Sequence, residues 1–171
     1  MNNQSTNPDK TVAALIHLST FTQFFFPLGN FIFPLIFWTA KKNDPFVNEH
    51  GKQALNFQIS LFLYAIFLLM LGVAGAILIG LNINFEDSFY FNDHHQWIGN
   101  PVEAGPVTIY IMVMAFLLIS LFVLNIYGVV SATIKAGEGK YFKYPLAINF
   151  LNASKTKDIF TASGDPENET A

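Results

Sequence analysis

The sequence predicts an all-α membrane protein: a polytopic helical bundle with two regular spans, a broken first segment and a short interfacial helix near the C-terminus. Of the 171 residues, 52% are hydrophobic and only 12% are charged, about half the charged fraction of an ordinary soluble domain. Residues 54–81 and 107–134 contain no Asp, Glu, Lys or Arg. Each stretch exceeds the ~20 residues that a helix needs to cross ~30 Å of hydrocarbon. These two observations predict the two regular spans.

The first apolar segment, residues 12–40, is equally free of charge but contains helix-breaking residues. Pro27, Gly29, Asn30 and Pro34 lie inside it, and a proline removes a backbone donor and clashes with the preceding turn. Two arrangements are open. One is a single span kinked near Pro27, which we place first, and the other is a re-entrant hairpin of two short helices. In both, we expect irregular backbone to be buried against other helices, because lipid offers it no hydrogen-bond partner.

The lysines indicate the orientation. The connector 41–53 carries three of the nine lysines and the region after the last span carries five, whereas the connector 82–106 has none and holds Glu86, Asp87, Asp93 and Glu103. Basic residues in short loops stay on the cytoplasmic side during insertion. We therefore expect a multi-pass protein of the bacterial inner membrane, with loop 41–53 and the C-terminus cytoplasmic and the acidic loop 82–106 outside. Charge does not decide the side of the N-terminus.

Three regions are predicted along the chain. A polar tail, residues 1–10, precedes a membrane domain over residues 11–151, and a polar tail with the composition of a disordered segment follows at 152–171. Between the last span and this tail, Pro145 is a suitable first helical residue. Apolar residues follow it between Lys143 and Lys155, a pattern that predicts a short helix on the inner leaflet.

Polar side chains gather near the cytoplasmic ends of the segments. Asn48 is expected to cap the second helix. Asn56 starts that span and Asn125 lies ~27 Å along the next, at a similar depth, so we expect their amides to approach each other or a shared partner. We favour a structural lock over a transport path. The full candidate cluster is His17, Asn30, Glu49, His50, Lys52, Asn56, Gln58 and Asn125.

Small residues recur every fourth position on both spans, which permits close helix approach. The two triplets are Gly72, Ala76, Gly80 and Gly128, Ala132, Ala136. Because the helices are antiparallel, the first triplet lies at the outer end and the second at the inner end. They cannot face each other, so each is expected to meet either the first segment or another copy of the protein.

The sequence lacks recognisable catalytic chemistry. It has no Cys and no Arg, so thiolate nucleophiles, thiolate metal sites and guanidinium clamps are absent. The stretch "GEGK" lacks the spacing of a phosphate-binding P-loop, and His94 and His95 are interpreted as solvated groups of an acidic loop. We expect no enzyme, no cofactor, no metal site and no nucleic-acid partner. The expected partners are the bilayer and either further copies or other membrane proteins.

Three blocks resemble a known family: "AALIHLS", "PLIFWTAKKNDPFVNEHGKQALNFQIS" and "AGEGKYFKYPLAINF". In order and spacing they are similar to the DUF4870 family of small bacterial membrane proteins of unknown function, grouped with Tic20-like proteins. The resemblance covers about residues 11–151, and the loop 82–106 is longer and more acidic than the family pattern.

The resemblance implies a non-enzymatic scaffold or accessory subunit of a membrane complex on a Tic20-like helical core. Because Tic20 is a component of chloroplast protein import, it also implies an alternative, a component that translocates a polypeptide or small solute.

Overall fold

The computed structural model describes residues 8–82, 89–91, 97–99 and 101–153. Its elements are α1 (Lys10–Leu18), the 3₁₀ helix η1 (Ser19–Phe24), α2 (Gly29–Ala40), α3 (Pro45–Asn82), strands β1 (Phe89–Phe91) and β2 (Trp97–Gly99), and α5 (Pro101–Glu138). The chain divides into two compact units. We call Met1–Leu61 with Asn125–Ala171 the hairpin unit and Phe62–Leu124 the two-helix unit, and each is described by itself.

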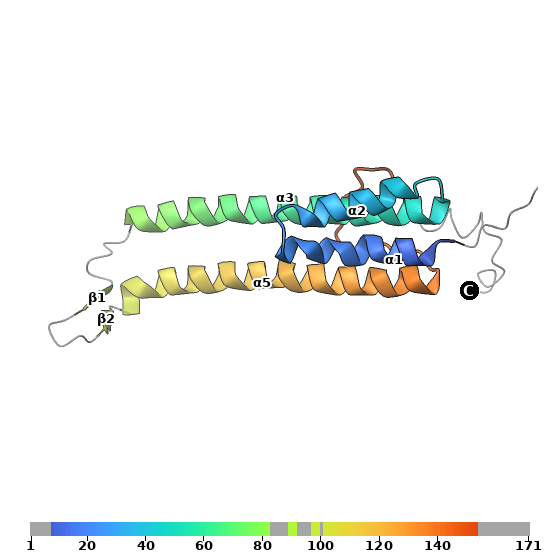
Figure 1. Cartoon of the computed structure of the whole chain (residues 1–171). Coiled ribbons are helices and arrows are strands. Elements are labelled where there is room, and N and C mark those ends of the chain that lie inside the picture. The colour runs from blue at the N-terminus through green and yellow to red at the C-terminus, as the bar shows by residue number, and fades with distance from the viewer. Residues whose placement is uncertain (1–7, 83–88, 92–96, 100, 154–171) are drawn as a thin grey trace, which may run out of the picture. The chain divides into compact units, whose positions relative to one another are not determined.

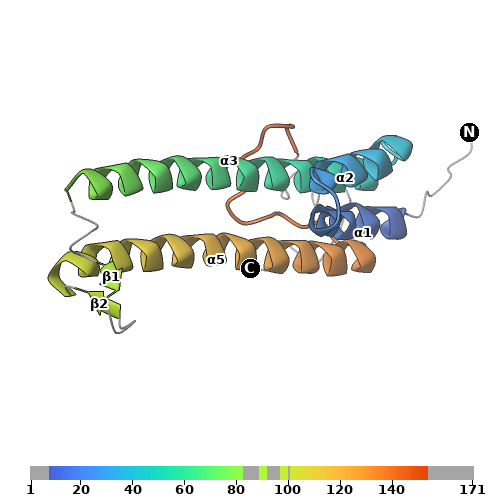
Figure 2. The same ribbon diagram turned by 60° about the vertical axis from the view of Figure 1, so that its left-hand side comes forward.

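The first apolar segment forms a helical hairpin. α1 and α2 pack against each other in opposite directions, joined by η1 and a bend at residues 25–28, as both ribbon views show (Figures 1 and 2). The kinked single span, which the sequence analysis placed first, is therefore wrong, and the hairpin alternative is the one observed. At the bend, Leu28 adopts the left-handed conformation (φ 60°), and Gly29 lets α2 approach η1. A Cβ on Gly29 would lie 2.6 Å from Oγ1 of Thr22.

Hydroxyl side chains satisfy the backbone where α1 ends. Ser19 Oγ donates to the Ile16 carbonyl at 2.8 Å, and Thr20 Oγ1 donates to the His17 carbonyl at 2.8 Å. Thr22 Oγ1 donates to the Ser19 carbonyl at 2.7 Å. The last carbonyls of a helix have no partner within it, so this run of Ser and Thr lets the chain turn without leaving those carbonyls exposed to an apolar environment.

The predicted spans lie inside the two long helices, α3 and α5, which are long and apolar enough to cross a membrane. α3 begins earlier than the sequence indicated, because Asp44 caps it: its Oδ1 accepts from the backbone N–H of Phe46 at 2.8 Å and of Val47 at 3.3 Å. Asn48 is not the cap. It lies within the first turn, where its Oδ1 accepts from Trp38 Nε1 at 2.9 Å and ties α2 to α3.

After α5, residues 139–153 form an extended strap and not the predicted interfacial helix. The strap's backbone donors are used by side chains of α3. Asn56 Oδ1 accepts from the N–H groups of Phe150 and Leu151 at 3.1 and 2.8 Å, and Ser60 Oγ accepts from Ile148 at 2.8 Å. A backbone N–H that donates to a side chain of α3 cannot also donate to a carbonyl within a helix. The predicted helix starting at Pro145 is therefore wrong. Most of the expected C-terminal tail lies outside the described residues.

The second triplet of small residues packs inside the hairpin unit. Ala136 is buried against Ala13 of α1 and Phe46 of α3, and a Cβ on Gly128 would lie 2.9 Å from Phe57 and 3.0 Å from Tyr144. Ala136 therefore contacts the first segment, which is one of the two neighbours that the sequence left open for this triplet.

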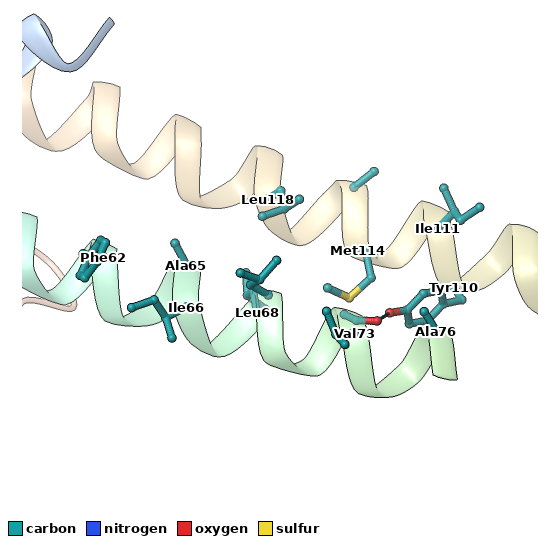
Figure 3. Close-up of a pocket in the computed structure, with 13 residues that line it drawn as sticks. Phe62, Ala65, Ile66, Leu68, Val73, Ala76, Tyr110, Ile111, Met114 and Leu118 are labelled. Carbon is teal, nitrogen blue, oxygen red and sulfur yellow. Dashed lines mark hydrogen bonds between the residues drawn. The ribbon is translucent and has the colours of Figure 1, made fainter. Parts of the chain in front are cut away.

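The two-helix unit contains the distal part of α3 and the beginning of α5, with a small ribbon between them. β1 and β2 pair antiparallel, with Tyr90 opposite Ile98, and they are the only strands in the described ranges. Most of the acidic loop lies outside the described residues. Between the helices an open apolar groove of about 760 Å³ is lined by residues such as Phe62, Leu68 and Met114 (Figure 3).

Gly72 faces α5 across this groove. The Tyr110 hydroxyl donates to the Gly72 carbonyl, and Met114 lies beside the same glycine (Figure 3). The expectation that the first small triplet meets the first segment or another copy is therefore wrong for Gly72, because its neighbours belong to α5.

Candidate functional site

The candidate site is a buried polar core in the hairpin unit, built around the first four turns of α3. Helix α3 is covered on several faces here, by α1, α2, the end of α5 and the strap. The buried polar side chains are His17, Thr20, Glu49, His50, Gln53, Asn56, Gln58, Ser60 and Asn125. Buried polar groups are costly unless they are hydrogen-bonded, so the partners of these side chains define what the core does.

Two histidines and a tyrosine form a continuous hydrogen-bonded chain. His17 Nε2 lies 2.8 Å from His50 Nδ1, and the Tyr144 hydroxyl lies 2.8 Å from His17 Nδ1. The exposed fractions of His17, His50 and Tyr144 are 0, 1 and 2%. Two arrangements satisfy both contacts with neutral rings. In one, Tyr144 donates to His17 Nδ1 and His17 Nε2–H donates to His50 Nδ1. In the other, His50 Nδ1–H donates to His17 Nε2 and His17 Nδ1–H donates to the Tyr144 hydroxyl oxygen. These hydrogen bonds join α1, α3 and the strap.

Aromatic rings enclose this chain. The ring centroid of Phe46 lies 4.4 Å from that of His50, and Tyr141 stacks on His50 at 5.8 Å. Phe57 stacks on Tyr144 at 4.1 Å. The second ring nitrogen of His50, Nε2, is buried with no hydrogen-bond partner in the described part of the chain.

The two tyrosines of the strap keep their protons. Burial raises the pKa of Tyr144 well above its usual value of 10.0. The pKa of Tyr141 is also raised, first by burial and then by the nearby carboxylates of Glu49 and Asp44. Both hydroxyls are therefore neutral near pH 7. They act as hydrogen-bonding groups, not as phenolate bases or ligands.

A second hydrogen-bonded chain links α2, α3 and α5 through amide side chains. Asn30 Nδ2 donates to Gln58 Oε1 at 3.0 Å, and Gln58 Nε2 donates to Asn125 Oδ1 at 3.5 Å. The predicted meeting of Asn56 with Asn125 is wrong. Asn56 points to the strap, where its Nδ2 donates to Asn149 Oδ1 at 3.0 Å, and Gln58 is the residue that reaches Asn125.

The remaining candidates lie near the entrance of α3. Glu49 is buried and accepts from Gln53 Nε2 at 3.2 Å, one turn along the same helix. Lys52 is half-buried and the hydrogen-bonded chains above do not include it. In the described ranges, no three His, Asp or Glu side chains come together in an arrangement that could hold a metal ion.

The strap contributes two residues to the site that were not predicted from the sequence, Tyr144 and Asn149. Tyr144 and Asn149 contact His17 and Asn56 from more than 90 positions away. Both lie in the stretch "YFKYPLAINF", where the sequence predicted a helix starting at Pro145. An extended strap has no helical periodicity, so its aromatic and amide residues gave no signal of burial.

The chain matches one family model over residues 8–151, that of the MamF/MmsF proteins, described as the magnetosome magnetite crystal formation protein family. The resemblance to the DUF4870 and Tic20-like proteins is thereby overturned, although the quoted blocks lie inside the matched range. No curated protein and no solved structure shows significant similarity to the chain.

Proposed function

The chain belongs to the MamF/MmsF family, and from that premise we propose that it is a non-enzymatic membrane component of magnetosome magnetite crystal formation. The family match over most of the chain is the observation that carries this proposal. The import-like alternative depended on the Tic20 resemblance and falls with it.

The chain is a membrane protein, with two helices that are long and apolar enough to span a bilayer. Their large apolar side chains point outward in the two-helix unit, including Leu69, Met70 and Phe116. A soluble protein rarely exposes so continuous an apolar surface. These side chains contact lipid.

The orientation is part of the proposal. The lysine distribution favours a cytoplasmic location for loop 41–53, which we call the elbow, and for the C-terminus. The hairpin brings the start of α1 to the same elbow, because the Asp9 backbone N–H donates to Asp44 Oδ2 at 2.9 Å and Lys41 pairs with Asp9 at 3.5 Å. The N-terminal end of α1 is then cytoplasmic too, and the acidic connector faces the opposite side, the lumen in a magnetosome.

The polar core supports an accessory role over catalysis. The ring nitrogens of His17, the amide of Asn56 and the amide of Gln58 are all engaged within the protein. A catalytic site needs a nucleophile or base that can reach substrate, whereas these groups fasten the hairpin and the strap to α3. The core therefore maintains a shape in the membrane on which crystal formation depends.

The test is complementation in a magnetite-forming bacterium that lacks its own copy of the protein. The wild-type chain should restore crystal number and size, measured by electron microscopy. Tyr144→Phe removes the hydroxyl but keeps the ring, so it should restore crystals in proportion to its level in the membrane. A Tyr144→Phe protein that is present at the wild-type level yet restores nothing would favour a chemical role. If the wild-type chain did not restore the crystals, the proposed function would be contradicted.

A further inference from the structure

The tip of the hairpin is an exposed apolar surface. The side chains of Phe24, Phe25, Phe26 and Leu28 are all exposed, and that of Phe25 reaches 81%. The bend is nevertheless tightly bonded inside, because the backbone N–H groups of Phe25 and Phe26 both donate to the Thr22 carbonyl, at 3.0 and 2.9 Å. The N–H groups at the bend are hydrogen-bonded within the protein and its rings face outward, so the bend fits an environment without water.

The base of the hairpin carries the charge. No charged residue occurs from Thr11 to Ala40, while Asp9, Lys10, Lys41 and Lys42 flank the segment. The Asp9–Asp44 hydrogen bond and the Lys41–Asp9 ion pair hold the two ends together. Charge is thus confined to one end of the hairpin, and the exposed side chains of Phe24–Leu28 lie at the other.

The length of the hairpin fits one leaflet. α2 has 12 residues, which span about 18 Å at 1.5 Å per residue. The hydrocarbon core is about 30 Å thick. With its base at the headgroups, the hairpin places its tip near the middle of the bilayer and does not reach the far side.

We propose that the hairpin α1–η1–α2 is a one-leaflet wedge, with its Phe24–Leu28 tip among the acyl chains of the leaflet beside the elbow and its base lysines among anionic headgroups. Charge complementarity supports the base contact, and the exposed rings support the tip contact. A wedge adds cross-section to one leaflet only, so it favours membranes in which that leaflet is convex. The proposal depends on the membrane location and not on the role in crystal formation.

Depth is tested first, in the cysteine-free chain reconstituted into vesicles. Phe25→Cys carrying a fluorescent label should be quenched more by lipids brominated near the ends of their acyl chains than by lipids labelled at the headgroup. Asn43→Cys, at the base, should show the opposite order. On intact vesicles and cells, Phe25→Cys should resist impermeant thiol reagents from both sides. Labelling from the elbow side would place the tip at the surface, and labelling from the far side would make the segment a span. Either result overturns the wedge.

The preference for curved membranes is tested by comparing how the protein distributes between small and large vesicles. The full chain is reconstituted into a mixture of small and large vesicles, and molecules with the elbow outward are identified by labelling of Asn43→Cys. Protein per lipid area should be higher in the small vesicles. Replacing Phe24, Phe25 and Phe26 with Ala should abolish that enrichment. The matched control replaces three exposed residues of α5, Ile109, Met112 and Phe116, with Ala and should retain it. Equal density in both vesicle sizes, or equal loss in both variants, would contradict the proposal.

Discussion

The hairpin unit and the two-helix unit use the same two helices in opposite ways. From Phe46 to Ser60, α3 is almost entirely buried and carries His50, Asn56 and Gln58 into hydrogen bonds. From Phe62 onward, the same helix has mainly exposed apolar side chains and faces a groove lined almost entirely by apolar side chains. A membrane helix can thus hold polar groups only where protein surrounds it, because lipid cannot pair with them.

This contrast shows what the hairpin and the strap do for the fold. They cover the polar part of α3, and the polar part in turn holds them. We therefore expect substitutions to have large effects in the hairpin unit and small effects in the two-helix unit.

Asn56→Leu should have the largest effect. It removes the acceptor for two backbone N–H groups of the strap and the donor to Asn149. At about 1–3 kcal/mol for each buried group left unpaired, we expect a loss of about 3 kcal/mol, measured by unfolding in mixed micelles. The strap should also become sensitive to protease. The control Ser120→Ala removes a hydroxyl bonded only within α5 and should leave both readouts unchanged.

Gly51→Ala should destabilise the protein by about 2 kcal/mol. The added Cβ would lie 2.3 Å from the Trp38 ring, whose Nε1 is held by Asn48. Overpacking costs about 1–3 kcal/mol, and the better helix propensity of Ala returns at most about 1 kcal/mol.

The matched control for Gly51→Ala is Gly72→Ala, in the same helix but in the two-helix unit. There the nearest atom to the new Cβ is the flexible end of Met114, at 3.3 Å. Thermal unfolding in detergent should show no loss of stability for Gly72→Ala. Equal losses at both glycines would remove the distinction between the two units.

Tyr144→Phe should cost about 1.5 kcal/mol, because it leaves His17 Nδ1 buried without its partner. It should also change the pH dependence. The pKa of Tyr144 is raised in the folded state, so its contribution to stability is fully present below the unfolded value near 10 and declines as the pH rises above it. Wild type should therefore lose stability more steeply above pH 10 than Tyr144→Phe. Parallel curves would show that Tyr144 is not buried as described, since Tyr141 titrates in both proteins.

Substitutions in the hydrogen-bonded amides Gln58 and Asn125 should have the smallest effect on stability. Gln58→Leu and Asn125→Leu remove the same 3.5 Å contact, so a double-mutant cycle should yield a coupling energy of about 0.6 kcal/mol, the average for interhelical hydrogen bonds in membranes. Asn56→Leu and Asn125→Leu should be additive, because these residues have different partners. Coupling between Asn56 and Asn125 would restore the network that the sequence suggested.

The sequence predicted those parts of the fold that local residue patterns determine. Charge-free runs gave the two spans, and Pro27 and Gly29 marked the break in the first segment. The choice between kink and hairpin required contacts that the local pattern does not indicate. Gly29 packs against Thr22 across the bend, and Asp9 bonds Asp44 from 35 positions away.

The strap was mispredicted for the same reason. Pro145 and the apolar residues after it favour a helix locally, but Asn56 and Ser60 take the backbone donors that such a helix would use. In the site, the sequence placed His17 and His50 in one candidate polar cluster but did not indicate that they bond each other. Their 2.8 Å contact depends on the hairpin, and their third partner, Tyr144, depends on the strap.

The central claim is that the first segment folds back so that α1 lies beside the end of α5. Ala13 and Ala136 are buried in one cluster, and the chain has no native cysteine. In membranes, the double variant Ala13→Cys, Ala136→Cys should form an intramolecular disulfide on mild oxidation. Ala13→Cys with Ala115→Cys should not, because Ala115 lies about 32 Å further along α5. A single kinked span would put Ala13 at the far face of the membrane, so absence of the Ala13–Ala136 crosslink in well-expressed protein would contradict the account.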